Sequence, residues 1–114
     1  MVDNFEIQFQ SNSVKIKFSD FISDSLLYIN QSLNGEDLLI FKNDEPYVWI
    51  FSLKNNDLYE KNEFKDEYQN ISLSDFITSP IKFLEISEKE SDIFVFNNKE
   101  PVLEIRSYYE RDFN

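Results

Sequence analysis

The sequence predicts a single α+β domain in which two tandem copies of one β-α-β-β unit form a pseudo-symmetric, dimer-like whole. Residues 37–52, DLLIFKNDEPYVWIFS, return 55 positions later as DIFVFNNKEPVLEIRS at 92–107. The tetrapeptide SDFI at 19–22 returns at 74–77 with the same offset. Within each copy, a strand-like alternation of apolar residues is followed by a helical stripe and then by two more apolar strands.

The first copy begins with a strand and an amphipathic helix. Apolar residues alternate with lysines in VKIKF at 14–18, which is typical of a strand with one apolar face. Ser19 or Asp20 then suits the cap of a helix. The apolar stripe of this helix recurs at helical spacing and consists of Ile22, Leu26, Ile29 and Leu33. Gly35, the only glycine in the chain, suits the left-handed position just after the helix ends.

A hairpin completes the unit, and the second copy repeats it with one difference. The strands DLLIF and PYVWIFS flank a turn at Asn43 and Asp44, and Pro46 belongs at a strand start because it has no N–H. In the second copy, Pro80 suits a first helical position. We therefore expect a short turn at SDFIT and a separate helix from Pro80 to about Glu90. The stripe of that region is Ile77, Ile81, Leu84 and Glu88.

The two repeats divide the chain into residues 1–55 and 56–114. The first repeat carries an extra N-terminal strand, NFEIQF, with Phe5, Ile7 and Phe9 on one side. The second includes the polar connector at 55–70. This segment fits either a helix near 57–68 or a mobile link between the repeats, and the sequence does not distinguish the two.

Composition narrows the possible functions. The chain has no Cys and no His, which excludes disulfides, thiolate zinc sites and imidazole or thiolate catalysis. Paired carboxylates lie in turns or on solvated faces, so we expect a non-enzyme with no catalytic residue, cofactor or metal site. The N-terminus has no signal-peptide pattern and no membrane span is evident, so a cytoplasmic location is expected.

The charge is strongly negative: 22 acidic residues against 11 basic ones give a net charge of −11. Phosphate binding depends on Lys and Arg, so this charge opposes nucleic-acid affinity and favours a basic protein as partner. The alternative is that the acidity serves solubility alone.

The order of motifs resembles the Phd/YefM type of antitoxin, the prevent-host-death family. The resemblance is carried by VKIKFSDFISDSLLYINQSLNGEDLLIFKNDEPYVWIFS and, more weakly, by ISLSDFITSPIKFLEISEKESDIFVFNNKEPVLEIRS, which together cover about two-thirds of the chain. Gly35-Glu36 followed by NDEP is its most specific part. The resemblance implies that the two copies form in one chain what the family forms as a homodimer, so we expect a monomer.

The functional residues of the family carry over only in part. The resemblance implies operator binding through a basic residue after S-[DE]-F, but Ile22 and Ile77 occupy that position, and the first Arg of the chain is Arg106. It also implies a toxin-wrapping segment, for which the connector at 55–70 is the obvious equivalent. We therefore expect a non-enzymatic acidic inhibitor that occludes a nucleic-acid-handling protein, such as a toxin or a defence nuclease complex. It could be an antitoxin, an immunity protein, or a phage anti-defence factor such as an anti-CRISPR acting as a DNA mimic. The alternative is a Phd-like DNA-binding autorepressor of a toxin-antitoxin operon.

Two groups of residues are candidates for partner binding. The first is the alternate face of the last strand, which is Tyr47, Trp49 and Phe51 in copy one but Val102, Glu104 and Arg106 in copy two. These aromatics either bind a partner or are covered by the N-terminal strand. The second is the acidic run EISEKESD, with Glu85, Glu88, Glu90 and Asp92, which either mimics phosphates or is a solvated helix end.

Overall fold

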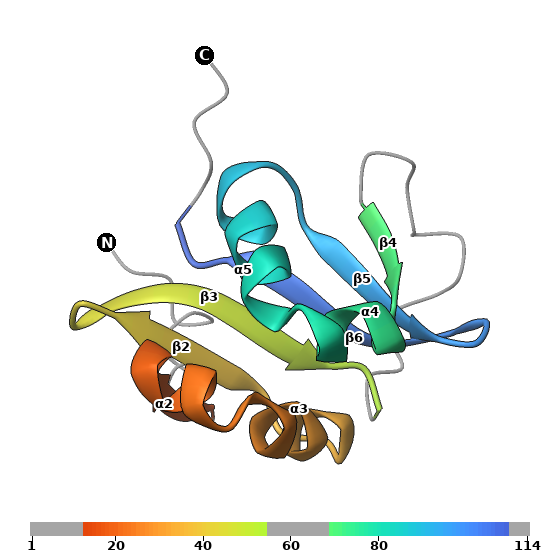
Figure 1. The fold of residues 1–114 in the computed structure, drawn as a ribbon, viewed down its shortest axis with the longest axis horizontal. Coiled ribbons are helices and arrows are strands. Elements are labelled where there is room, and N and C mark those ends of the chain that lie inside the picture. Colours follow the sequence, from red (N-terminus) through yellow and green to blue (C-terminus); the bar gives the residue numbers. More distant parts are fainter. Residues whose placement is uncertain (1–12, 55–68, 110–114) are drawn as a thin grey trace.

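The computed structural model describes residues 13–54 and 69–109, and within them six strands form one mixed sheet. The strand order is β1-β2-β3-β6-β5-β4 (Figure 1). The first half contributes β1 (Val14–Lys17), β2 (Leu38–Lys42) and β3 (Glu45–Ser52), and the second half β4 (Gln69–Ser72), β5 (Ile93–Asn97) and β6 (Glu100–Ser107). Because β3 and β6 pair antiparallel at the centre, the two halves share a single sheet.

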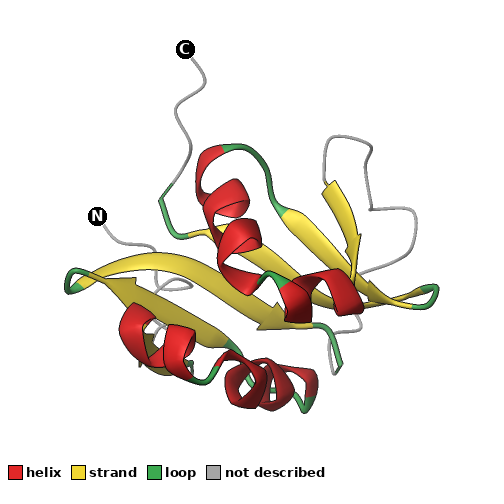
Figure 2. Cartoon of the chain, viewed as in Figure 1, coloured by secondary structure: helices red, strands yellow, loops and turns green. Residues whose placement is uncertain are grey.

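Four helices in the described ranges cover one face of this sheet (Figure 2). They are α2 (Phe18–Ser23), α3 (Ser25–Leu33), α4 (Leu73–Thr78) and α5 (Pro80–Lys89). The core lies between the helices and the sheet and includes the buried residues Phe21, Ile29, Val48, Ile50, Phe76, Leu84, Leu103 and Ile105. This confirms a mixed α+β fold in which alternate residues of β3 and β6 are core. No helix in the described ranges has the length and apolar character that crossing a membrane requires.

The 55-residue repeat is present in the backbone. Every described element of the first half has a counterpart 55 positions later, and only α5 extends one residue further than α3. The strand registers repeat as well: Val14 pairs with Leu38 and Gln69 with Ile93, and both hairpins shift register at equivalent points. Ile50 and Ile105, which are equivalent residues, face each other across the β3–β6 pair. A local two-fold axis therefore passes between these two residues.

Each half contains two helices. One helix was expected in copy one, and a short turn at SDFIT followed by one helix in copy two; SDFIT instead belongs to helix α4, and α5 begins at Pro80 as expected. The expectation of one continuous helix in copy one is wrong, because the backbone at Asp24 leaves the helical region with φ −149° and ψ 51°. Its counterpart Ser79 has φ −137° and ψ 60°, so the predicted break before Pro80 is confirmed. Since Asp24 interrupts the helical periodicity, Ile22 and Leu26 from the predicted stripe are about half exposed, at 52% and 51%.

The helix ends confirm one prediction and correct another. Neither Ser19 nor Asp20 caps α2, because β1 runs directly into the helix after Lys17 and Asp20 lies within the first turn. Asp20 is favourable there because the helix dipole is positive at that end. Gly35 has φ 116°, and its N–H donates to the Ser32 carbonyl at 3.0 Å, so the predicted left-handed C-terminal position is confirmed.

The first hairpin turn is as expected. Asn43 and Asp44 have positive φ values of 55° and 63°, which both residue types tolerate better than most, and Pro46 lies near the start of β3. The N-terminal strand with Phe5, Ile7 and Phe9, and the connector helix near 57–68, lie outside the described residues.

Candidate partner-binding surface

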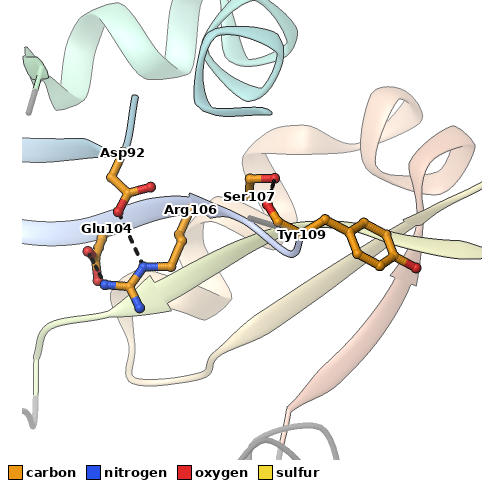
Figure 3. Close-up of polar contacts among 5 residues, drawn as sticks. All are labelled: Asp92, Glu104, Arg106, Ser107 and Tyr109. Carbon is orange, nitrogen blue, oxygen red and sulfur yellow. Dashed lines mark hydrogen bonds and ion pairs between the residues drawn. The ribbon is translucent and has the colours of Figure 1, made fainter. Parts of the chain in front are cut away.

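A cavity of about 610 Å³ lies on the helix side of the sheet, between the first hairpin, α5 and the end of β6. We call it the tyrosine cavity because Tyr47 and Tyr109 both line it. The backbone N–H of Tyr108 donates to the Tyr47 carbonyl at 3.0 Å. Figure 3 shows the Ser107 hydroxyl, which donates to the Tyr109 carbonyl at 2.8 Å. These bonds fix the chain beyond β6 next to β3, so both tyrosines are held by the end of the shared sheet.

Tyr47 reaches this cavity because of the register shift in the first hairpin. Ile40 pairs with Val48 and Phe41 with Pro46, which leaves Tyr47 as the extra residue of a bulge. Its ring packs edge-on against Phe18 with the centroids 5.7 Å apart. Tyr47 therefore lies on the helix side, and the expectation that it shares a face with Trp49 and Phe51 is wrong.

Charges surround the Tyr47 ring. The Lys42 ammonium lies 4.9 Å from the ring centroids of both Phe18 and Tyr47. Burial, followed by the negative charges of Glu88 and Glu85, raises the pKa of Tyr47 to about 12. The phenol is therefore a neutral hydroxyl group well beyond neutral pH.

The acidic run divides into three environments. Glu85 and Glu88 are three residues apart on α5, so they share a helix face, and both line the tyrosine cavity. Glu90 is the exposed C-cap of α5. Asp92 is only 7% exposed, so it is neither a surface mimic of phosphate nor part of a solvated helix end. The structure thus brings Tyr47 together with two of the four predicted acids.

Asp92 belongs instead to a cluster around Arg106 (Figure 3). The guanidinium Nε lies 3.4 Å from Asp92 Oδ2, and Nη2 donates to Glu104 Oε2 at 3.0 Å. The Glu104 side chain is 1% exposed, so its charge requires this partner. The guanidinium also lies 5.8 Å from the Phe51 ring centroid, which joins the cluster to the aromatic strand.

Trp49 is buried on the sheet face opposite the helix-side core. Its ring stacks on Phe51 with the centroids 5.0 Å apart and lies 6.1 Å from Tyr108. Trp49 itself is 7% exposed and Phe51 is half-buried. The two rings thus pack together, but Trp49 presents little surface to a partner. The predicted N-terminal strand that could cover Trp49 lies outside the described residues. Partner binding by Trp49 and Phe51 stays a prediction.

A third surface follows the helices. Four large apolar side chains are exposed on α2, α3 and α4, and we call them the apolar helix patch: Ile22, Leu26, Leu27 and Ile77. Contacts of α3 with both α2 and α4 make these helices neighbours. Residues 18–33 and 73–78 contain three aspartates and no Lys or Arg. Ile22 and Ile77 are equivalent residues of the two repeats, so the patch includes the position where the family resemblance implies a basic residue.

Asp37, just before β2, accepts a hydrogen bond from the Ser52 N–H at 2.9 Å. Desolvation nevertheless raises the pKa of this carboxyl, since the hydrogen bond only partly opposes it. In the part of the chain that the structure describes, no three acidic side chains are grouped so as to hold a metal ion.

Comparison with known proteins adds no relative. No protein-family model, no curated protein and no solved structure matches the chain.

Sequence reasoning did not select Lys42, Glu45 or Tyr109, although they line the same cavity as Tyr47. Comparison of the two repeats contained a signal for the site. Tyr47 of the first copy and Tyr109 of the second correspond to Val102 and Lys54, so neither aromatic residue of the cavity is repeated in the other copy.

Proposed function

We propose that the chain is a non-enzymatic acidic inhibitor that binds a nucleic-acid-handling protein and occludes its basic surface. An antitoxin, an immunity protein and a phage anti-defence factor all fit this activity. The observation that carries the proposal is the helical surface on α2, α3 and α4, which exposes the apolar helix patch and carries aspartates but no cation.

The chemistry of this surface favours a protein over DNA as its partner. A phosphate backbone requires Lys and Arg, and the aspartates at positions 20, 24 and 75 would repel it. Exposed apolar side chains surrounded by charge are typical of protein interfaces, where the apolar centre holds the complex and the charges speed encounter. A DNA-mimicking inhibitor combines these two features, whereas an autorepressor would need cations at this surface.

The duplicated architecture supports a second part of the proposal, namely that the chain is a fused pair of Phd-type units. The repeated elements, the repeated registers and the pairing of Ile50 with Ile105 are what a fused homodimer would produce. In such a dimer, equivalent helices from both halves would form the binding surface. Ile22 and Ile77 are such equivalent positions.

The test is to co-express the chain with the proteins encoded by neighbouring genes and to measure their DNA binding by gel shift. We expect the chain to abolish a neighbour's shift while giving none of its own on its upstream DNA. Ile22→Lys and Ile77→Lys should weaken inhibition by about thirtyfold each, since interface hot spots are worth about 2 kcal/mol. Gln69→Lys adds the same charge on β4 and serves as the matched control. A sequence-specific shift by the chain itself would contradict the proposal and favour the autorepressor.

A further inference from the structure

Both halves of the duplicated fold line the tyrosine cavity: the first hairpin comes from the first half, and α5 and the end of β6 come from the second. Because the halves share their elements and registers, the counterparts of these residues occupy the place related to the cavity by the local two-fold axis. At four positions of that related place the wall residues are replaced by neutral, apolar or basic ones: Tyr47, Glu85, Glu88 and Tyr109 correspond to Val102, Asn30, Leu33 and Lys54. The fold therefore forms without an aromatic, acidic wall at this place. A reason other than folding is therefore needed for the wall of the tyrosine cavity.

The walls of the cavity have the chemistry of a cation receptor. The Lys42 ammonium already lies 4.9 Å from the Phe18 and Tyr47 ring centroids, which shows that these rings accept a positive charge. Across the described ranges, Arg106 makes all the ion pairs, so Glu45, Glu85 and Glu88 have no cationic partner within 4.0 Å. Three carboxylates therefore line the cavity outside any ion pair, against the two lysines that also line it, Lys42 and Lys89, so the lining carries a net negative charge next to a neutral phenol.

The shape and composition of the cavity favour arginine over other cations. A guanidinium can stack on an aromatic ring and bind a carboxylate with two parallel hydrogen bonds, whereas an ammonium is a point charge. A cavity of about 610 Å³ is large enough for such a side chain together with adjoining peptide. A divalent metal ion fits less well, because the described residues hold no cluster of three acidic ligands.

We infer that the tyrosine cavity receives an arginine side chain from an exposed basic segment of the inhibited protein. This inference rests on the proposed function, which requires a basic partner, and it adds the residue type and the place where that partner is held. Glu85 and Glu88 bind the guanidinium, and Tyr47 and Tyr109 pack against its stem and plane. The apolar helix patch and the tyrosine cavity are then two separate contacts with one partner.

The test uses three nine-residue Gly-Ser peptides that carry three arginines, three lysines or three citrullines. Citrulline has the shape of arginine without its charge. We expect the arginine peptide to shift the backbone amide resonances at 45–47, 85–89 and 107–109. It should bind several-fold more tightly than the lysine peptide, and the citrulline peptide should not bind.

The variants exchange cavity residues for their counterparts in the other half. Tyr47→Val and Glu85→Asn should each weaken binding of the arginine peptide by about tenfold, because the first removes a cation–π contact and the second a charge-assisted hydrogen bond. The control variant, Glu36→Gln with Glu100→Gln, removes two exposed charges outside the cavity and should change binding less than twofold. Thermal melting of each variant confirms that the fold is retained.

Two results separate this inference from the proposed function. Shifts confined to α2, α3 and α4, or equal weakening by the cavity and control variants, would overturn the cavity inference and leave the inhibitor proposal standing. Arginine-specific shifts in the cavity, combined with no inhibition of any neighbouring protein, would support the arginine site and overturn the inhibitor proposal.

Discussion

Replacing Trp49 with alanine should destabilise the fold strongly, because this side chain is packed on the second face of the shared sheet. At 7% exposure it buries nearly its whole surface, and a buried aromatic ring removes about 200 Å² from water. At about 25 cal/mol per Å² this corresponds to about 5 kcal/mol, of which the remaining Cβ retains a part. Stacking with Phe51 and Tyr108 is lost as well. We therefore expect a loss of about 4 kcal/mol in the free energy of unfolding, within the usual range for this substitution.

The measurement is urea denaturation followed by far-ultraviolet circular dichroism, because the variant lacks the only tryptophan. With a slope of about 1.5 kcal/mol per M, the midpoint should fall by roughly 2–3 M. Trp49→Phe keeps an aromatic ring in the stack and should lose about half as much or less. A loss below about 1 kcal/mol for Trp49→Ala would refute the packing argument and would restore Trp49 as a candidate for surface contact with a partner.

Four further predictions concern charge and assembly. Asp37→Asn should raise the melting temperature at pH 7. Desolvation raises the folded-state pKa of Asp37 above 3.8, so the negative charge of this carboxyl disfavours the folded state at neutral pH. The gain in melting temperature should shrink as the pH falls toward 3.8, because the carboxyl of the unmodified protein then becomes protonated. Asp92→Asn is the equivalent change in the second half. It should instead lower the free energy of unfolding by about 1–3 kcal/mol, because it removes a charged partner of Arg106. Equal effects of the two variants on stability would contradict this contrast. Tyr47 has a folded-state pKa of about 12, against 10 for the free phenol, so the free energy of unfolding should fall as the pH rises from about 10 toward 12. Urea denaturation at about pH 9 and about pH 11 measures this loss. Tyr47→Phe should lose less stability between the two pH values than the unmodified protein, because phenylalanine has no phenol to ionise. Sedimentation should give a mass of 13.7 kDa, and a stable dimer would contradict a self-contained pair of halves.

The strands and hairpins could be predicted because their signals are local. Alternating apolar residues, Asn43 and Asp44 at the turn, and Pro46 near a strand start each act within a few residues. The two-helix arrangement could not be predicted in the first half, because the stripe through Ile22 and Leu26 satisfies helical spacing even though the backbone turns at Asp24. Helical periodicity indicates which residues could share one face of a helix. A single residue with a non-helical backbone, such as Asp24, redirects the helix after it, so residues on either side of it no longer share that face.

The candidate site was predictable only in part for a similar reason. Strict alternation placed Tyr47 with Trp49, but one bulge residue reverses its direction, and no local pattern marks that bulge. Burial of Asp92 depends on Arg106, which is 14 residues further along the chain and on a neighbouring strand. Glu85 and Glu88 were selected from the sequence, whereas their proximity to Tyr47 required the tertiary fold.

The antiparallel pairing of β3 with β6 also affects how the protein behaves at low abundance. Two separate subunits joined at such a strand pair would dissociate on dilution, and their fold would depend on concentration. Here one covalent chain contains both strands, with Ile50 and Ile105 facing each other at the centre. Both central strands are thus present in every molecule, so a few copies per cell retain the same β3–β6 pairing as many.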